Sequence, residues 1–346
     1  MPRGTTPSRK KQHVNVTLTR DVRFKTKTTG LEHVEFVNNA LPELNLSDVD
    51  PSAQFLGHTL RLPFMVSCMT GGYADALRIN RQLAEVCEEM QIAMGVGSQR
   101  QALEDRQYHR TFSVVREVAS TIPVVGNIGA AEVANLDLDA AKRLVDLVHA
   151  DAFAVHLNPL QEFLQTEGNP NFRGVLQGIA HLVEGLPVPV IVKEIGAGIS
   201  VQVARRLLDV GVRYIDVAGA GGTSWAGVET LRRKEKEMAM RFWDWGIPLT
   251  VALRDLAKMK ANGESFQLIA SGGITSGIDA AKCLALGADL AAAARPFLVA
   301  VKRKGKNGLR GLLRTWGDEL RGVMFLTGSR TLVELHRASL VISGVQ

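Results

Sequence analysis

The most informative stretch of this sequence is FQLIASGGITSGIDAAKCLALGADLAAAARPF, residues 266–297, in which two short apolar runs flank a helical pattern over 277–286. The first run ends in the turn SGGI, residues 271–274, and the second ends in AARP, residues 293–296. Glycine lets an anion approach the backbone closely, and the free N–H groups at a helix start bind phosphate. The last two loops of a (β/α)8 barrel often form such a site, so this pair predicts a barrel that binds a phosphate-bearing molecule.

Strand-like runs alternate with helical patterns from about residue 62 to 330. The eight runs are PFMVSCM, IAMGVGS, PVVGNIG, AFAVHLN, PVIVKEI, YIDVAGA, FQLIASG and LAAAARP. The helical patterns cover 76–90, 107–119, 138–149, 173–184, 200–210, 250–260 and 277–286. Eight such units in series favour an α/β fold of the (β/α)8, or TIM-barrel, type. An open doubly wound sheet is disfavoured, because no GxGxxG motif follows the first strand.

Two segments interrupt this rhythm. Residues 1–60 form an N-terminal extension, and FLGHTLRLP at its end predicts a hairpin that closes the barrel floor. Residues 61–346 form the barrel, with a tail over 308–341 that reads as helix, turn, helix. The loop 222–248 after strand six is long and rich in charge and tryptophan. Loops after strands lie on the catalytic face, so we interpret it as a lid, with an oligomer contact as the alternative.

The composition restricts the class of protein. Of the 346 residues, 46% are hydrophobic, which suffices for a large core, and the formal net charge of +6 suits an anionic ligand. The three cysteines have no metal-like spacing, which predicts reduced thiols and a cytoplasmic protein. We expect no membrane span, no secretory signal and no nucleic-acid motif. Of the two basic runs, SRKKQH and VKRKGKNGLR, the second is expected in a solvent-facing turn between helices.

The run AFAVHLNPLQE, residues 152–162, places a polar cluster where a buried strand ends. His156 alone would more often be a core histidine, but its polar neighbours favour a binding role. Glu162 alone would be an ordinary first-turn acid of a helix. Lys193 leaves a buried strand and needs an anionic partner. That partner is either a cofactor such as a reduced flavin, or a carboxylate, namely Glu194 or Asp216, of which Glu194 is weakened by strand alternation.

The motifs, taken in order, resemble those of the type 2 isopentenyl diphosphate isomerases. The matching stretches are RKKQH, MTGG, GSQR, HLNPLQE, VKEIGAGIS, AGAGGTSW, SGGI, ARPF and MFLTGSRTLVEL, and they run from residue 9 to about 337. The resemblance implies an FMN-bound (β/α)8 barrel that requires Mg²⁺ and assembles as tetramers or octamers. It also implies reduction of the flavin, normally by NAD(P)H with NADPH as the expected donor, although isomerisation of isopentenyl to dimethylallyl diphosphate is not a net redox reaction.

The resemblance also assigns residues position by position. The implied FMN contacts are Cys68, Met69, Thr70, Ser98, Asn127, Lys193, Thr223, Gly272, Gly273, Ile274, Ala293 and Ala294. The implied substrate contacts are Arg9, Lys10, Ser98, Gln99, Arg100, His156, Asn158 and Gln161, and Glu162 is the implied Mg²⁺ ligand. Cys68 departs from the family, where a smaller residue is expected, but a backbone contact tolerates that change.

The expected chemistry protonates an alkene and removes a different proton. Gln161, His156 and Glu229 are the candidate catalytic residues, and Glu229 is expected to relay protons towards Gln161, unless it is a solvated loop carboxylate. Because strong acids are scarce at this site, a reduced flavin would supply the proton and stabilise the cation.

Three rival functions would each need different residues or no flavin. A 2-hydroxy-acid oxidase would need a histidine base near strand seven, where IASGGI has none. A dehydrogenase of the purine-nucleotide type would need a cysteine within 218–230, and there is none. A flavin-free, phosphate-binding scaffold barrel is the alternative from a different class.

Overall fold

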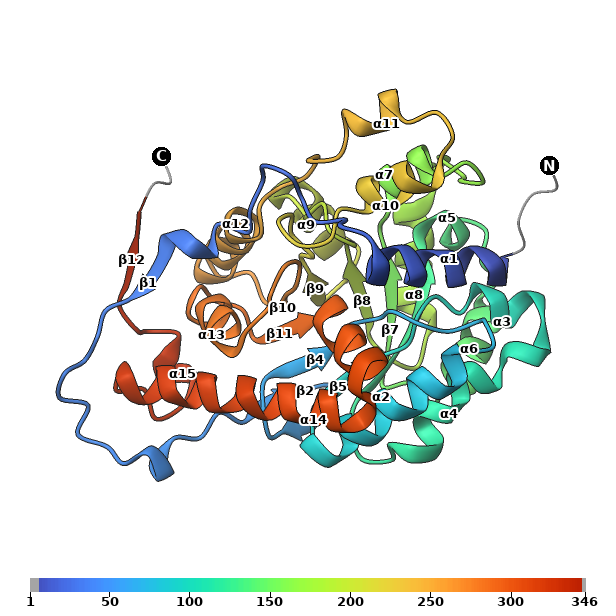
Figure 1. Ribbon diagram of the computed structural model, residues 1–346. Helices are drawn as coiled ribbons and strands as arrows, with labels where there is room; N and C mark the ends of the chain where they lie inside the picture. Colours follow the sequence, from blue (N-terminus) through green and yellow to red (C-terminus); the bar gives the residue numbers. More distant parts are fainter. Residues whose placement is uncertain (1–5, 344–346) are drawn as a thin grey trace.

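A closed barrel of eight parallel strands forms the centre of the computed structural model, which describes residues 6–343 (Figure 1). The barrel strands are β4 (Phe64–Val66), β5 (Ala93–Gly95), β6 (Val124–Gly129), β7 (Ala152–His156), β8 (Val190–Lys193), β9 (Tyr214–Asp216), β10 (Gln267–Ala270) and β11 (Leu290–Ala293). They follow one another around the barrel in chain order, and β11 closes onto β4. The (β/α)8 prediction is therefore confirmed, with one strand in each of the eight expected runs.

The barrel interior is packed rather than hollow at its floor. Two short strands, β2 (Ala53–Phe55) and β3 (His58–Leu60), form the antiparallel hairpin that the sequence predicted. Phe55 and Leu60 are almost fully buried and pack against inward-facing side chains such as Met65 and Ile191. A plugged floor leaves the opposite end, where the strands terminate, as the only end of this barrel with room for a ligand.

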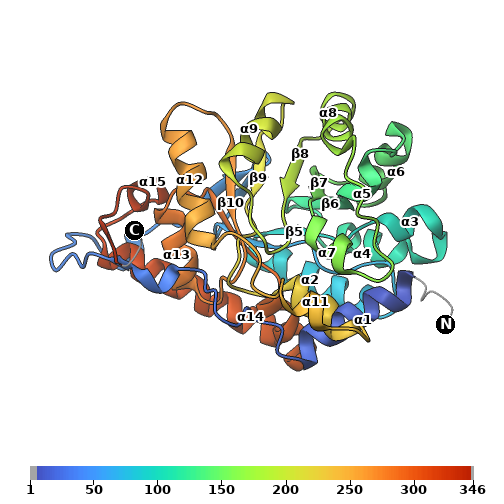
Figure 2. The same cartoon turned by 90° about the horizontal axis from the view of Figure 1, so that it is seen from above.

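Helices lie around the outside of the barrel strands (Figure 2). Those that follow barrel strands are α2 (Ala76–Met90), α3 (Arg100–Glu104), α4 (Arg110–Val118), α5 (Ala130–Val133), α6 (Leu138–Leu147), α7 (Pro159–Leu164), α8 (Val175–Gly185), α9 (Val201–Asp209), α12 (Leu249–Ala261) and α13 (Gly277–Ala285). Single 3-10 turns are η1 (Leu31–His33), η2 (Leu46–Asp48) and η3 (Arg106–Tyr108). In α2, Ile79, Leu83 and Val86 recur at helical spacing and are buried, which explains why this helix matches its predicted bounds.

The loop after β9 is not a plain loop. It contains α10 (Trp225–Arg232), capped by the Ser224 hydroxyl, which accepts a hydrogen bond from the Gly227 N–H, and the short helix α11 (Glu237–Met240). The Ser224 hydroxyl also donates to the Trp243 carbonyl at 2.6 Å, which ties the end of the segment to its start. The segment is thus an ordered wall on the catalytic face.

The chain ends differ from the prediction. A long helix, α14 (Arg295–Leu326), absorbs the basic run 301–310 and is kinked at Gly305, whose φ is 58°. After α15 (Leu332–Leu335), the chain forms β12 (Leu340–Ile342), which pairs antiparallel with β1 (Val34–Phe36). The prediction of helix, turn, helix for 308–341 is therefore wrong in its last part, and the expected turn within 301–310 is a helix kink instead.

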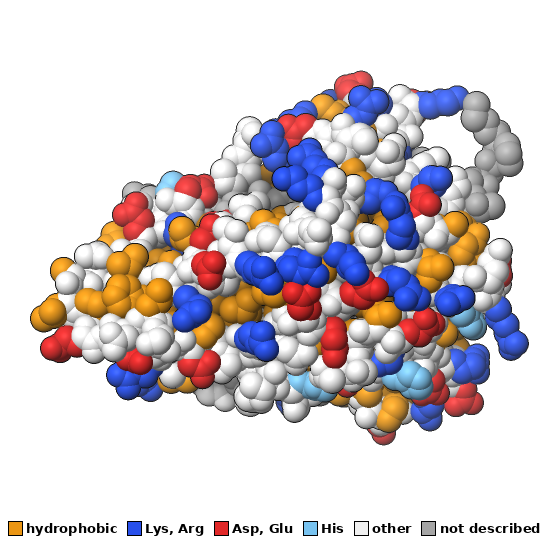
Figure 3. All heavy atoms as spheres, turned by 60° about the horizontal axis from the view of Figure 1, so that its bottom comes forward, with side chains coloured by type: hydrophobic (Ala, Val, Ile, Leu, Met, Phe, Trp, Pro, Cys, Tyr) orange, Lys and Arg blue, Asp and Glu red, His pale blue; other side chains and the backbone are white. Residues whose placement is uncertain are grey.

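The basic run in α14 is partly neutralised by α2. Lys306 lies 2.7 Å from Glu85, and Arg310 lies 2.7 Å from Glu89. On the face seen in Figure 3, acidic and basic side chains accordingly lie side by side. Such exposed pairs contribute little to stability, so this run has a solvent-facing structural role. None of the helices between residues 6 and 343 is long and apolar enough to cross a membrane.

Candidate active site

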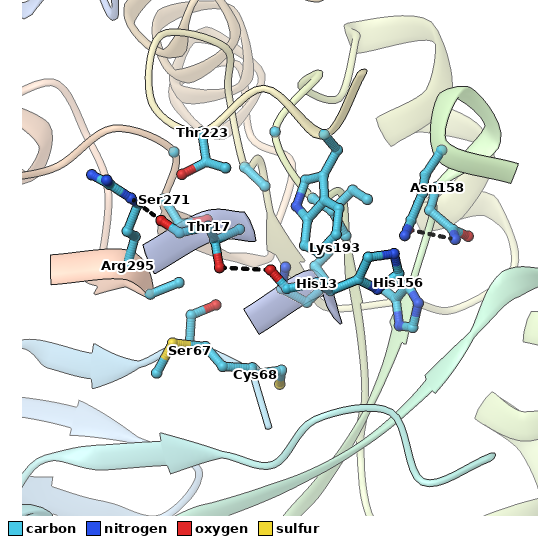
Figure 4. A pocket seen from close by; sticks show the side chains of 18 of the residues that line it. His13, Thr17, Ser67, Cys68, His156, Asn158, Lys193, Thr223, Ser271 and Arg295 are labelled. Atoms are coloured by element: carbon cyan, nitrogen blue, oxygen red, sulfur yellow. Dashed lines mark hydrogen bonds between the residues drawn. The ribbon is translucent and has the colours of Figure 1, made fainter. Parts of the chain in front are cut away.

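A cavity of about 370 Å³ opens at the carboxyl ends of the barrel strands. Figure 4 shows side chains from several strand ends, among them Lys193, His156 and Cys68, around this space. Loops that follow β4, β5, β6, β7, β8, β9, β10 and β11 all contribute to its lining. A volume of this size suits a cofactor together with a small substrate.

The N-terminal helix α1 (Thr6–Thr19) covers the mouth of the cavity. The Lys10 ammonium donates to the Ser98 carbonyl at 2.6 Å, and the Arg295 Nε donates to the Thr17 carbonyl at 2.8 Å. Burial, reinforced by the charge of Arg9, lowers the pKa of Lys10 to about 7. An anion bound in the cavity would oppose that shift, so the helix presents a cation that is stabilised by an anionic ligand.

Glycines shape one wall of the cavity at the end of β10. Gly272 and Gly273 have φ of 102° and 85°, a backbone region that other residues rarely adopt. A Cβ added at Gly272 would lie 2.0 Å from the Gly219 carbonyl oxygen, and one at Gly222 would lie 2.5 Å from the Gly273 nitrogen. These glycines allow the loops after β9 and β10 to pack closely, and without side chains their backbone lines the cavity as a shallow cradle next to the start of α14. This arrangement fits a phosphate group.

Lys193 lies at the end of β8 and is almost completely buried, yet it lines the cavity. Its ammonium donates to the Glu194 carbonyl at 2.6 Å and lies 3.7 Å from Asp216 Oδ2. The Glu194 carboxylate instead accepts backbone N–H groups of Ile195 and Gly196, each at 2.6 Å. Of the carboxylate partners that the sequence left open, Asp216 is the one present, and the cavity side of Lys193 stays available to a cofactor.

His156 is held neutral by its surroundings. Burial, with the charges of Lys193 and Lys10, lowers the pKa of His156 to about 3. Its Nδ1 lies 3.0 Å from Asn127 Oδ1, an acceptor, which assigns the proton of the neutral ring to Nδ1. A multiply charged anion beside the ring would raise this pKa again, so the second ring nitrogen, Nε2, can donate only when such a ligand is present.

The polar cluster at the start of helix α7 lines the same cavity. Asn158 Nδ2 donates to Glu162 Oε1 at 2.9 Å and to Gln161 Oε1 at 3.2 Å. Glu162 Oε2 accepts the Asn169 N–H at 2.7 Å. Asn158 Oδ1 is buried and has no hydrogen-bond partner within residues 6–343. A buried oxygen without a partner is unfavourable, so this atom and Glu162 together offer oxygen ligands to a bound group.

Glu229 is a fully buried carboxylate behind this cluster. Its Oε1 accepts a hydrogen bond from Gln161 Nε2 at 3.1 Å and lies 2.8 Å from His13 Nε2 of α1, and its Oε2 pairs with Arg232. Burial alone would raise the pKa of Glu229, but the contacts with His13, Arg232 and Gln161 outweigh it, so the pKa lies below its usual value. Its reading as a solvated loop carboxylate is therefore wrong.

Most residues assigned from the sequence line this one cavity. Those that do are Arg9, Lys10, Cys68, Met69, Thr70, Ser98, Arg100, Asn127, His156, Asn158, Gln161, Glu162, Lys193, Thr223, Gly272, Gly273, Ile274, Ala293 and Ala294. Gln99 is different, because its fully buried side chain donates to the Leu144 carbonyl and accepts the Asn127 N–H. Glu229 does not line the cavity, but it accepts a hydrogen bond from Gln161, which does.

Sequence reasoning missed three residues with clear positions in the site. His13 lies within the motif RKKQH, but nothing in its residue type predicted a contact with Glu229. Arg295 lines the cavity and pins α1, and Ser271 donates to Asp216 at 2.5 Å. The last contact could have been anticipated, because Asp216 and Ser271 end neighbouring strands.

The sequence itself matches known families. The sequence model described as FMN-dependent dehydrogenase matches residues 123–342. A protein of Chlorobaculum parvum named isopentenyl-diphosphate delta-isomerase is 45% identical over 346 residues, covering 96% of each chain. A protein of the same name from Methanothermobacter thermautotrophicus is 41% identical over 336 residues, covering 97% of this chain and 93% of its own.

Solved structures share the fold at much lower identity. A flavocytochrome b2 superposes with a TM-score of 0.71 at 18% identity, covering 96% of this chain and 83% of its own. A mandelate oxidase superposes with a TM-score of 0.66 at 18% identity, covering 96% of this chain and 92% of its own. At such identity the likeness concerns the barrel alone, and the full-length relatives are the informative comparison.

Proposed function

Because the chain belongs to the isopentenyl-diphosphate delta-isomerases, within the wider FMN-dependent dehydrogenase family, we propose that it interconverts isopentenyl and dimethylallyl diphosphate with FMN as cofactor. The observation that carries this proposal is the convergence of two residue sets. Residues assigned to a flavin and residues assigned to a diphosphate come from different loops, yet they line one cavity. A barrel that bound only a phosphate would not require the second set.

The residues present fit FMN. The backbone cradle at Gly272 and Gly273 would take its phosphate, and Lys193 would face the ring edge that becomes negative on reduction. Burial raises the pKa of the Cys68 thiol to about 12, so this residue stays neutral beside the ring. When bound and reduced, FMN would supply an electron-rich ring and a proton-carrying position.

Replacing Gly272 by alanine should abolish or severely weaken FMN binding. The new Cβ would meet the Gly219 carbonyl at 2.0 Å, and the positive φ would add strain, so the cradle must open. The measurement is a fluorescence titration of the apoprotein with FMN. Gly311→Ala in α14 is the matched control, because a Cβ there meets nothing within 4 Å and should leave FMN affinity unchanged. Equal FMN affinity in both variants would contradict the cradle.

The residues also fit Mg²⁺. Within residues 6–343 no three His, Cys, Asp or Glu side chains form a metal-binding group, so a cation here would rely on Glu162 and the ligand's own oxygens. Mg²⁺ commonly binds substrate phosphates with only one or two protein carboxylates, retaining water. We therefore propose that Glu162 holds Mg²⁺ against the diphosphate, with Asn158 Oδ1 nearby to orient water or substrate.

Gln161 and Glu229 would take part in proton transfer at the alkene carbons. Gln161 lines the cavity and donates to Glu229 Oε1 through its Nε2. Since the pKa of Glu229 is lowered, this carboxylate is ionised at neutral pH and suits accepting a proton rather than donating one. Helix α1, held by Lys10 and Arg295, keeps water from the reacting carbons.

Removing residues 1–12 should weaken substrate binding and leave FMN in place. Arg9 and Lys10 line the cavity and would close over the diphosphate, and losing a charge-assisted bond costs roughly 1.5–3 kcal/mol, or about 10- to 150-fold in affinity. The single variant Lys10→Ala should raise KM similarly. Lys11→Ala is the control, since the Lys11 side chain is 70% exposed and forms a long ion pair with Asp75, at 3.9 Å. Loss of FMN on truncation would mean that the segment is structural.

Other properties follow from the family resemblance and belong to the proposal. We propose NADPH as the reductant of the flavin and assembly into tetramers or octamers. The three cysteines are unpaired, which supports a reducing, cytoplasmic location.

The deciding experiment is an isomerase assay with FMN and Mg²⁺, run with and without reductant. We expect a yellow protein that isomerises isopentenyl diphosphate only when the flavin is reduced. A colourless protein that does not take up added FMN would favour a flavin-free phosphate-binding barrel. Oxidation of a 2-hydroxy acid would favour an oxidase, although the loop after β10 supplies no histidine base.

A further inference from the structure

Three neighbouring strands place a chain of polar groups at the wall of the cavity. Lys193 of β8 and Asp216 of β9 are register partners, so their side chains lie on the same side of the sheet. The Lys193 ammonium lies 3.7 Å from Asp216 Oδ2, and Asp216 Oδ1 accepts the Ser271 hydroxyl at 2.5 Å. Lys193 and Ser271 line the cavity, whereas Asp216 lies behind them and does not.

Asp216 is held firmly in this position. It is 1% exposed, and its Oδ1 also accepts the Ala218 N–H at 3.2 Å. The two donors on Oδ1 fix the orientation of the carboxylate and leave Oδ2 to face the Lys193 ammonium. Of this ion pair, the Lys193 end lines the cavity and the Asp216 end lies behind it.

A charge next to a redox group changes its potential. The reduced flavin is more negative at its pyrimidine edge than the oxidised one, so a nearby cation favours reduction and a nearby anion opposes it. At this burial, charges a few ångströms away are poorly screened. A carboxylate just behind Lys193 must therefore cancel part of the field that the ammonium exerts on the cofactor.

We propose that Asp216 is a positioning residue that orients the Lys193 ammonium towards the flavin. Its negative charge weakens the field that the ammonium exerts on the flavin, and Asp216 thereby sets the redox potential of the cofactor. This inference rests on the proposed FMN binding. The competing explanation is that Asp216 only balances a buried charge, which many buried ion pairs do. Both explanations predict lower stability when the pair is broken, but only the first predicts a changed potential.

The test is the midpoint potential of FMN in the holoenzyme of Asp216→Asn. Asparagine keeps the shape and can still accept from Ser271, but it removes the negative charge. We expect the potential to rise by about 30 mV or more, which corresponds to at least tenfold stronger preference for the reduced cofactor. Asp289→Asn is the matched control, because Asp289 pairs with Lys260 at 2.5 Å and lies outside the cavity lining. Its potential should equal that of the parent protein.

A second variant covers the case in which Asp216→Asn does not fold. Asp216→Glu keeps the charge and extends it towards the ammonium, so the potential should fall. An unchanged potential in a folded variant, or a shift of opposite sign, overturns the inference. Failure of this inference can be distinguished from failure of the proposed function. In the second case the parent protein itself would not bind FMN or would not isomerise the substrate.

Discussion

Replacing Glu162 by glutamine should lower isomerase turnover about a hundredfold while the fold and the bound flavin survive. The substitution keeps the size of the side chain, and the remaining carbonyl oxygen can still accept from Asn158 or Asn169. What it removes is the negative charge that we propose for holding Mg²⁺ to the diphosphate. Raising the Mg²⁺ concentration should therefore restore part of the activity.

The measurement is turnover with reduced FMN over a series of Mg²⁺ concentrations, together with a flavin spectrum. The matched control is Asp139→Asn, which removes the first-turn acid of α6, away from the cavity lining. Its effect should be confined to stability, at roughly 0.3–1 kcal/mol. If Glu162→Gln behaves like this control, with the parent protein's turnover and Mg²⁺ dependence, Glu162 is an ordinary helix-start acid.

Replacing Glu229 by glutamine should reduce turnover by roughly 10²–10⁴-fold, the usual range for losing a general base. Glu229 Oε1 is the acceptor next to Gln161, and a glutamine there cannot hold a transferred proton. The change also leaves the Arg232 guanidinium, only 9% exposed, without its nearest carboxylate. Breaking such a pair costs about 3–5 kcal/mol of stability.

Because the same change affects both properties, the control must separate them. Glu167→Gln removes the other carboxylate beside Arg232, since Glu167 Oε1 lies 3.4 Å from Arg232 Nη2. Glu167 does not line the cavity. That variant should lose some thermal stability and keep its turnover. Thermal unfolding and turnover at saturating substrate are measured on both. A Glu229→Gln protein that is less stable but fully active would make Glu229 a structural residue.

The barrel itself was predictable because its signals are local. Each β strand is a short apolar run followed by a turn, as VIVK before EIGAG illustrates, and α2 was located from its buried stripe. The pairing of β1 with β12 was not predictable, since Val34 and Ile342 are brought together only by the completed fold. The interruption at Gly305 was predicted, since its φ of 58° is non-helical, but the two helical parts of α14 meet there at a kink and not at the expected turn.

The candidate site was predictable in its members more than in its contacts. Residue type and position at strand ends placed Lys193 and Glu162 correctly at the cavity. Which atoms come into contact depends on the direction of each side chain. The hydrogen bond from the Gln99 amide to the Leu144 carbonyl was therefore not predicted. The contact of His13 with Glu229 was also missed, because it joins a terminal helix to a segment over two hundred residues away.

The roof formed by α1 has a consequence for the newly made protein. Thr17 leaves the ribosome first, but its partner Arg295 follows 278 residues later. At about 5–20 residues per second, the helix waits roughly 15–55 s for that partner. None of its side chains is fully buried even when docked, and an isolated helix of 14 residues is marginal in water. The barrel closes only when β11 pairs with β4, and Arg295 follows β11 directly, so the roof docks at the time the barrel itself is completed.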